Sequence, residues 1–286
     1  TDQAIRFLER FRDDPMCLFL SWGPPHAPYR MVPQEFLDMY QPEEIDLRPN
    51  VEGVDRAAIA GYYAHITAID RNIGRLMDAL DELGLSEDTI LVFSSDHGDM
   101  LWAHGRLKKQ QPWEESIRVP LLIRWPDHLP VGEVRDTLIS VVDYTPTFLG
   151  MMGVAVPAQM NGVDLSATLL GKSDREQSSV FINEYVSFDQ ARIYQPWRGV
   201  RTKRYTYARW LQGGVVLYDN QEDPYQLHNL MHEPGHEALE EVLEQELQGW
   251  LERLGDDFMA GEDHIRQLGQ WEEWQIREEH FYGFAT

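Results

Sequence analysis

The spacing of apolar residues along the first half of the chain predicts alternating helices and strands. Apolar side chains recur at helical intervals over residues 4–12, and again in steps of three and four from Ile59 to Leu83, where Gly84 ends a long amphipathic helix. Continuous apolar runs are typical of strands buried on both faces of a parallel sheet. Such runs occupy residues 16–20, 89–93, 119–124 and 138–142. This order predicts an α/β fold with a mostly parallel sheet sandwiched by helices.

The pattern changes near residue 172. The apolar runs that follow are short, aromatic and closely spaced, and Gly213-Gly214 is a good hairpin turn. They predict a smaller C-terminal antiparallel sheet, followed by an amphipathic helix at 236–254. The predicted organisation is an α/β part at 1–172, a sheet-and-helix subdomain at 173–255, and an acidic, aromatic tail at 256–286.

Charge and composition exclude some classes of function. The 286 residues carry a formal net charge of -23, which argues against a general nucleic-acid or anionic-membrane binder. No apolar run has the length of a membrane span. The single cysteine, Cys17, excludes an internal disulfide and lies inside the run 16–20, where we expect a buried, unreactive thiol.

Candidate chemistry gathers where the predicted strands end. Asp96 and His97 follow the run 89–93, and ligands of open α/β sheets bind beyond such strand ends. A carboxylate beside an imidazole suits a divalent cation. Three residues downstream could face an anion held by that metal: His104, Lys108 and Lys109. A fourth, His26, lies just beyond the end of the run 16–20.

Some polar residues near this stretch have a structural interpretation. Glu114 and Glu115 are predicted to start a helix or to pair with Arg118, and Asp143 to cap a helix. An isolated Asp-His-Gly step is itself more often a loop or cap than a metal site.

Four larger side chains keep two interpretations each. Arg198 and Arg201 either reach a substrate from the small sheet or form surface salt bridges. Trp102 and Trp113 either stack on a sugar or aryl group or simply pack.

Three segments in a fixed order carry a resemblance. They are GPPHAPY at 23–29, SDHGDMLWAHGRLKKQQPWEESIRVPLLIRWP at 95–126, and RGVRTKRYTYARW with LYDNQEDPYQLHNL between 198 and 230. Together they resemble the C-terminal portion of type I, formylglycine-dependent sulfatases of the alkaline phosphatase superfamily. The resemblance covers about residues 1 to 255, and it implies an alkaline phosphatase-like fold and hydrolysis of a sulfate monoester.

The resemblance also implies roles for individual residues. Asp96 and His97 match the second pair of metal ligands, for Ca²⁺ in most of the family and for Mn²⁺ or Zn²⁺ as alternatives. Lys109 matches the lysine that contacts a sulfate oxygen and the leaving-group oxygen, with Lys108 as the alternative one position away. His26 matches the histidine that binds the ester and acts as an acid toward the leaving group. His104 is expected to line the pocket.

One departure from the family pattern is important. The family's nucleophile is a formylglycine made from the cysteine of a Cys-x-Pro-Ser-Arg motif, and neither this motif nor the first metal pair occurs in these residues. We expect both in a missing N-terminal portion of the same protein, without which the segment cannot turn over substrate. The resemblance further implies a small-molecule or carbohydrate sulfate ester as partner and leaves room for a homo-oligomer. Many sulfatases are exported, which points to the periplasm or the exterior on resemblance alone.

Two other functions remain open at this point. Phosphonate monoester or phosphodiester hydrolases share the pattern, and relative rates on matched sulfate and phosphonate esters separate the two classes. A non-catalytic binding module derived from the fold predicts weak or absent metal binding.

Overall fold

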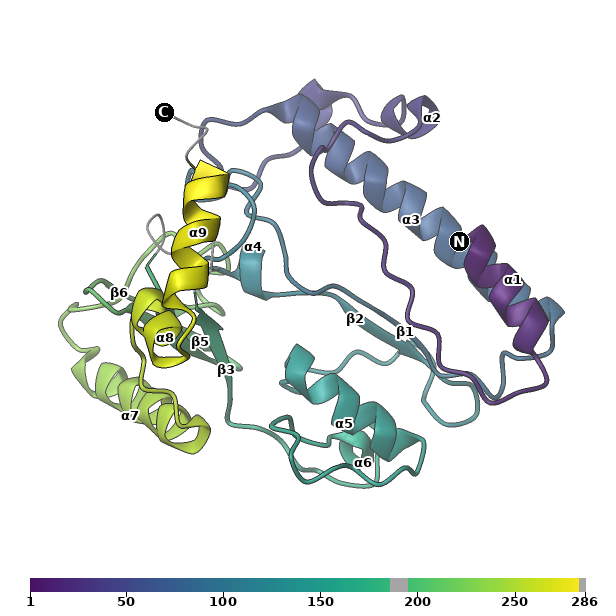
Figure 1. Ribbon diagram of the computed structural model, residues 1–286. Helices are drawn as coiled ribbons and strands as arrows, with labels where there is room; N and C mark the ends of the chain where they lie inside the picture. Colours follow the sequence, from purple (N-terminus) through teal and green to yellow (C-terminus); the bar gives the residue numbers. More distant parts are fainter. Residues whose placement is uncertain (186–194, 283–286) are drawn as a thin grey trace. The chain divides into compact units, whose positions relative to one another are not determined.

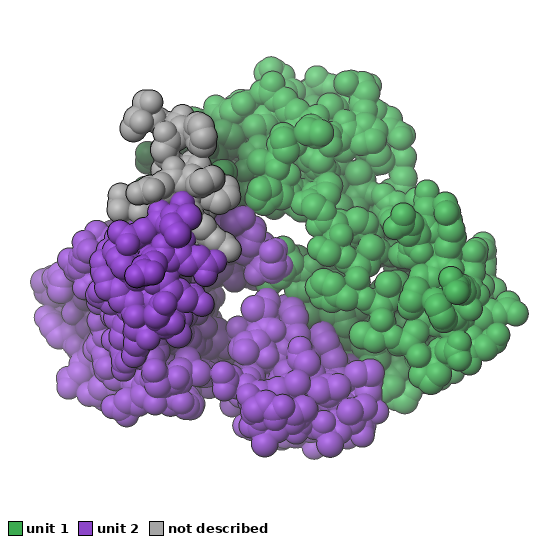
Figure 2. Space-filling model, in the orientation of Figure 1, with its two compact units in different colours: residues 1–95, 99–108, 119–133 green, residues 96–98, 109–118, 134–286 purple. Residues whose placement is uncertain are grey.

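The structure divides into two compact units (Figure 2). It is a computed structural model that describes residues 1–185 and 195–282. Unit 1 comprises residues 1–95, 99–108 and 119–133, and unit 2 comprises the remainder. The chain therefore changes unit several times within the stretch that carries the predicted chemistry. The division into parts 1–172, 173–255 and 256–286 stays a prediction.

The helices of unit 1 are organised by the long helix α3 (Arg56–Glu82). The Asp55 carboxylate caps its first turn by accepting from the Ala58 N–H, and Gly84, with φ of +69°, follows its end. Helix α1 (Asp2–Phe11) lies along α3 and buries Ala4 and Leu8 against it (Figure 1). Two short helices precede α3, α2 (Gln34–Leu37) and η1 (Pro42–Glu44). The predicted long amphipathic helix is confirmed.

Two of the predicted strands form a pair in unit 1. Strand β1 (Leu91–Ser94) pairs with β2 (Leu121–Arg124), with Leu91 opposite Arg124 and Ser94 opposite Leu121. The runs at 89–93 and 119–124 were therefore correctly identified as strands. Their pairing is antiparallel, whereas the apolar runs predicted parallel neighbours.

The other two predicted strands are wrong. Residues 16–20 and 138–142 have no strand structure, and helix α5 (Val141–Met151) begins inside the second run. No backbone hydrogen bond joins residues 16–20 to another described segment, and a strand exists only where a neighbour pairs with it. Met16 and Leu20 pack on α1 and α3, but Phe19 is 91% exposed. Cys17, expected to be buried, is exposed as well.

Unit 2 is built around the predicted antiparallel sheet. Its order is β3-β4-β5-β6, formed by β3 (Ser179–Glu184), β4 (Trp197–Thr202), β5 (Tyr205–Trp210) and β6 (Val215–Asp219). Gly213 and Gly214, both with positive φ, make the turn between β5 and β6. The appended antiparallel subdomain is therefore confirmed.

Each face of this sheet has its own apolar cluster. Helix α7 (Glu237–Leu254) covers one face, where Leu243, Leu247 and Leu251 pack on side chains of β4, β5 and β6. Successive side chains of a strand point to opposite faces of the sheet, so the alternate residues of these strands face away from α7. On that second face, Trp197, Ala208, Val216 and Tyr218 pack against residues of the short helix α4 (Glu114–Ile117) and its N-cap. The sheet thus supports part of the stretch that carries the predicted chemistry.

The remaining helices of unit 2 are α6 (Ser166–Leu169), α8 (Gly261–Gln267) and α9 (Trp271–Tyr282). At the start of α5, Asp143 completes a capping box with Ser140, so its predicted capping role is confirmed. Within the part of the chain that the structure describes, no helix has both the length and the apolar character of a membrane span.

Candidate active site

The predicted metal pair lies just after β1. Asp96 is 85% exposed, and its Oδ2 lies 3.6 Å from the Nε2 of His97. The His97 Nδ1 lies 2.7 Å from the Gly98 carbonyl oxygen, which can only accept, so Nδ1 is the donor and the neutral imidazole has its lone pair on Nε2. A backbone carbonyl that orients the distal nitrogen is the usual support of a metal-binding histidine. The carboxylate and the imidazole therefore fit two ligands of one divalent cation.

Gly98 fixes this pair to helix α4. Its N–H donates to the Ser116 carbonyl oxygen at 2.8 Å. A Cβ at this position would overlap the Glu115 carbonyl oxygen, so only glycine allows the two backbones to approach so closely. The position of the Asp96 and His97 backbone therefore depends on where α4 lies.

Helix α4 and the residues before it are fastened to the antiparallel sheet. The Trp197 Nε1–H donates to the Gln110 carbonyl oxygen at 3.0 Å, and the Trp113 Nε1–H donates to the Tyr218 hydroxyl at 3.2 Å. Trp113 also packs in the apolar cluster on this face. These contacts favour the packing interpretation of Trp113, and they hold the segment that begins with Lys109.

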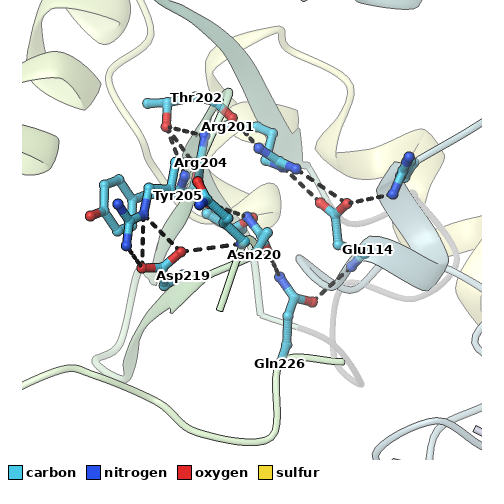
Figure 3. Close-up of polar contacts among 11 residues, drawn as sticks. Glu114, Arg201, Thr202, Arg204, Tyr205, Asp219, Asn220 and Gln226 are labelled. Carbon is cyan, nitrogen blue, oxygen red and sulfur yellow. Dashed lines mark hydrogen bonds and ion pairs between the residues drawn. The ribbon is translucent and has the colours of Figure 1, made fainter. Parts of the chain in front are cut away.

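A polar network centred on Glu114 completes this attachment (Figure 3). Its carboxylate is 9% exposed and accepts from the Arg201 guanidinium at 2.7 and 3.3 Å, while exposed Arg118 lies 3.8 Å away. The Glu114 N–H donates to the side chain of buried Gln226, which in turn donates to Asn220. The structural interpretation of Glu114 is confirmed, and Arg201 is committed to this ion pair.

Arg198 is also paired inside the protein. Its side chain is 0% exposed and its Nε lies 2.5 Å from the Asp256 Oδ2. Arg198 and Arg201 therefore form internal ion pairs in place of the surface salt bridges that the sequence left open, and each guanidinium group is already paired with a carboxylate.

Lys109 and Lys108 belong to different units although they are adjacent in the chain. Lys109, in unit 2, is half-buried, whereas Lys108, in unit 1, is exposed with φ of +64°. The Lys108 carbonyl oxygen accepts from the Met100 N–H at 2.6 Å. The turn from residue 100 to 108 is thereby closed just before Lys109.

His104 lies within this same turn. Its N–H donates to the Asn50 carbonyl oxygen at 2.7 Å, and its Nε2 lies 3.3 Å from the Asn50 Nδ2. Trp102, two residues earlier, packs on an apolar cluster that contains Ile59. The turn is therefore anchored on the segment that precedes α3 and on α3 itself.

The loop that carries His26 also rests on α3. His26 is exposed, and its Nδ1 lies 2.9 Å from the Ala27 carbonyl oxygen. Buried His65 of α3 makes a hydrogen bond to the Pro28 backbone; burial lowers the pKa of His65 more than this hydrogen bond raises it. Gly61 lets the Tyr29 carbonyl oxygen approach α3 so closely that a Cβ there would overlap it.

The structure thus divides the predicted site residues between the two units. Asp96, His97 and Lys109 belong to unit 2, and His26, His104 and Lys108 to unit 1. Among the described residues, no group of three or more histidine, cysteine or acidic side chains is placed to hold a metal ion. The six residues therefore keep their predicted roles as hypotheses.

The sequence missed two residues that connect these segments. The Tyr29 hydroxyl donates to the Asp99 Oδ2 at 2.8 Å, and the Asp99 Oδ1 accepts from the Leu101 and Lys108 N–H groups at 3.0 and 3.2 Å. The available signal was their position: Tyr29 follows His26 in one motif, and Asp99 follows His97 in the other.

Comparison with known proteins now identifies the class. The sulfatase family profile matches residues 1–154, and the profile of the C-terminal region of N-sulphoglucosamine sulphohydrolase matches residues 103–253. The chain belongs to the sulfatase family. Its predicted alkaline phosphatase-like fold is confirmed by its structural neighbours.

Individual relatives agree with this family. An ulvan-active sulfatase of Formosa agariphila is 38% identical over 275 residues, which cover 93% of this chain and 54% of that protein. A Bacteroides fragilis structure that carries the sulfatase name matches with a TM-score of 0.78 at 32% identity, over 90% of this chain and 58% of that one. The structure of a protein in complex with its substrate D-glucosamine-2-N,6-O-disulfate matches with a TM-score of 0.63 at 26% identity, over 71% and 42% respectively. The chain spans about half the length of the relatives it matches.

Proposed function

We propose that this chain is the C-terminal half of a sulfatase that hydrolyses a sulfate ester of a carbohydrate. The observation that carries the proposal is the Asp96-His97 pair, followed by Gly98, whose backbone packs directly against α4. The chain that contains this pair aligns with an ulvan-active sulfatase over 93% of its length. The carbohydrate follows from the names of two relatives, one active on ulvan and one bound to a sulfated glucosamine. The overall reaction consumes one water, breaks the S–O bond and releases sulfate and an alcohol.

Each predicted residue has a distinct task in this reaction. Asp96 and His97 would hold a divalent cation, Ca²⁺ or alternatively Mn²⁺ or Zn²⁺, and such a cation supplies Lewis acidity and neutralises sulfate charge. Lys109 would donate charge-assisted hydrogen bonds to a sulfate oxygen and to the leaving-group oxygen. His26 would give its proton to the departing alkoxide, which an imidazolium does well near neutral pH. Lys108 and His104 would line the substrate pocket.

The nucleophile is proposed to lie outside these residues. The printed sequence has one cysteine, Cys17, and Leu18-Phe19 after it does not fit Cys-x-Pro-Ser-Arg. A formylglycine in the other half of the protein would supply the attacking oxygen. The charge of -23 supports a site whose attraction for an anion is local, because the body as a whole repels it.

A metal titration tests the proposed ligands directly. In the full-length protein, isothermal titration with Ca²⁺ and with Mn²⁺ should show one site, and Asp96→Asn should weaken it at least about tenfold because a neutral amide replaces the charged carboxylate. The exposed Asp88→Asn is the matched control and should bind as the wild type does. Equal affinity in wild type and Asp96→Asn would refute the ligand assignment, and no binding at all would favour a non-catalytic module.

Matched esters test the reaction class. The full-length protein should cleave para-nitrophenyl sulfate faster than para-nitrophenyl phenylphosphonate, and the 286-residue chain alone should cleave neither. A faster phosphonate reaction would assign the protein to the phosphonate hydrolases. Turnover by the chain alone would show that its nucleophile lies within the printed sequence.

A further inference from the structure

The Asp99 carboxylate joins two segments that the proposed function uses. Its Oδ2 accepts from the Tyr29 hydroxyl, three residues after His26. Its Oδ1 accepts from two backbone N–H groups of the turn that ends at Lys108. One carboxylate therefore accepts three hydrogen bonds, one from the loop that carries His26 and two from the turn at residues 100–108, called the lysine turn below. All of these residues belong to unit 1.

Tyr29 is held rigidly enough to act as one end of such a link. Its ring lies edge-on to the Tyr62 ring, with centroids 6.0 Å apart, and 6.4 Å from the Trp102 ring. Its carbonyl oxygen is pressed against α3 at Gly61. Burial and the hydrogen bond to Asp99 raise the pKa of Tyr29 above its usual value, so the hydroxyl stays protonated and remains a donor at any working pH.

The turn at the other end needs support. Leu101, Trp102, His104 and Lys108 all have positive φ, a conformation that costs a non-glycine residue roughly 1–3 kcal/mol and persists only when the surroundings enforce it. The two hydrogen bonds to Asp99 Oδ1 and the Met100–Lys108 backbone bond close this turn. Without Asp99, the backbone that leads into Lys109 would lose two of these constraints.

We propose that the Tyr29–Asp99 hydrogen bond is a positioning contact that holds the His26 loop in register with the lysine turn. The inference rests on the proposed function, since it assumes that His26 protonates the leaving group. Tyr29 and Asp99 do not react in this scheme. They keep the imidazole where the departing oxygen will be, and a displacement of about 1 Å can cost about a hundredfold in rate.

The test is Tyr29→Phe in the full-length enzyme. Tyr207→Phe is the matched control, because the Tyr207 hydroxyl makes an equally short bond, 2.8 Å, to Glu244 of α7 in unit 2. Across aryl sulfates of rising leaving-group pKa, Tyr29→Phe should lower kcat by about 10- to 100-fold, with KM nearly unchanged. The loss should grow as the leaving group becomes poorer, because poorer leaving groups depend more on the acid. Tyr207→Phe should keep the wild-type slope.

A second variant separates positioning from general destabilisation. Asp99→Asn should show the same steeper slope, and the double variant should be no worse than Asp99→Asn alone, because both changes break one contact. Additive losses, or equal slopes in Tyr29→Phe and Tyr207→Phe, would overturn the proposal.

Hydrogen exchange keeps the proposal testable apart from activity. Tyr29→Phe should speed amide exchange in residues 23–31 and also in residues 100–109, whereas Tyr207→Phe should change neither. If the wild type cleaves no sulfate ester, the proposed function fails, and the exchange result still decides whether the two segments are coupled. Unchanged exchange in residues 100–109 of Tyr29→Phe would show that they are not.

Discussion

Arg201 on β4 and Glu114 on α4 form a two-point ion pair across 87 residues of sequence, with Nε 2.7 Å from Oε1 and Nη2 3.3 Å from Oε2. The side chains are 17% and 9% exposed, so water screens the pair little. Through this contact the antiparallel sheet holds α4, and α4 holds Gly98. The sheet thereby helps to position the Asp96-His97 pair, although none of its residues is a proposed metal ligand.

Removing one partner of this ion pair should be costly. Glu114→Ala leaves the Arg201 guanidinium buried without its carboxylate, and we expect a loss of about 3 kcal/mol or more in the free energy of unfolding, measured by urea denaturation. Arg118, whose side chain is 79% exposed, is the second partner of the same carboxylate. Arg118→Ala should therefore change the free energy of unfolding by about 0.5 kcal/mol or less. Similar losses in the two variants would contradict the central role of Arg201.

Two glycines of α3 should respond to alanine with opposite signs. Gly74 has open space where a Cβ would lie, so Gly74→Ala should stabilise the protein by about 0.5–1 kcal/mol through helix propensity. At Gly61 the added Cβ would overlap the Tyr29 carbonyl oxygen, so Gly61→Ala should lower the melting temperature and displace the His26 loop. Calorimetry of both variants decides the matter, and a stabilising Gly61→Ala would refute the close approach.

Asp219 should make stability depend on pH in the acid range. The hydrogen bonds from Arg204 hold the pKa of Asp219 below its ordinary value of 3.8, and the Gln221 and Glu222 N–H groups add to this effect. A lowered pKa means that the ionised carboxylate favours the folded state. Its contribution is therefore complete above about pH 4 and is lost as the pH falls through the lowered pKa.

The variant Asp219→Asn makes this measurable. At pH 6 we expect it to unfold more easily by about 1 kcal/mol, a modest figure because Arg204 is 44% exposed. The difference from the wild type should shrink as the pH falls below 4. Exposed Asp174→Asn should show no such trend, and a gap that widens in acid would reverse the assigned sign.

Alanine variants of Lys109 and Lys108 test which of the two adjacent lysines makes the proposed sulfate contact. Lys109→Ala in the full-length enzyme should lower kcat/KM for an aryl sulfate by about 100- to 1,000-fold, since a donor to the developing charge is removed. Lys108→Ala should cost no more than about tenfold, because the exposed ammonium is only expected to line the pocket. The reverse order would move the proposed sulfate contact to Lys108.

Regular elements were predictable where one short segment contains its own signal. The stripe of α3 shows its period over 27 residues, and the strands β3 to β6 come from short, closely spaced runs, the last two of which are separated by a Gly-Gly turn. Residues 16–20 show the limit of this reasoning. Their apolar run has the composition of a buried strand, but strand formation depends on a neighbouring chain segment that the run itself does not contain.

The candidate chemistry was partly predictable for the same reason. Asp96 and His97 are adjacent, and their place after a strand can be read locally. The Tyr29–Asp99 and Glu114–Arg201 contacts join residues 70 and 87 positions apart. A single sequence offers many tyrosines, arginines and carboxylates, and only folding selects which of them meet.

The backbone around the lysine turn also bears on how this protein would respond to laboratory evolution. Of the nine non-glycine residues with positive φ in the part of the chain that the structure describes, five lie between Leu101 and Gln110. Glycine or asparagine would relieve that conformation, so selection for heat resistance alone would favour them there. Variants selected in this way would be more stable to heat, but the turn that leads into Lys109 would be less constrained. A screen for robust variants should therefore select for turnover in every round, or hold residues 101–110 constant.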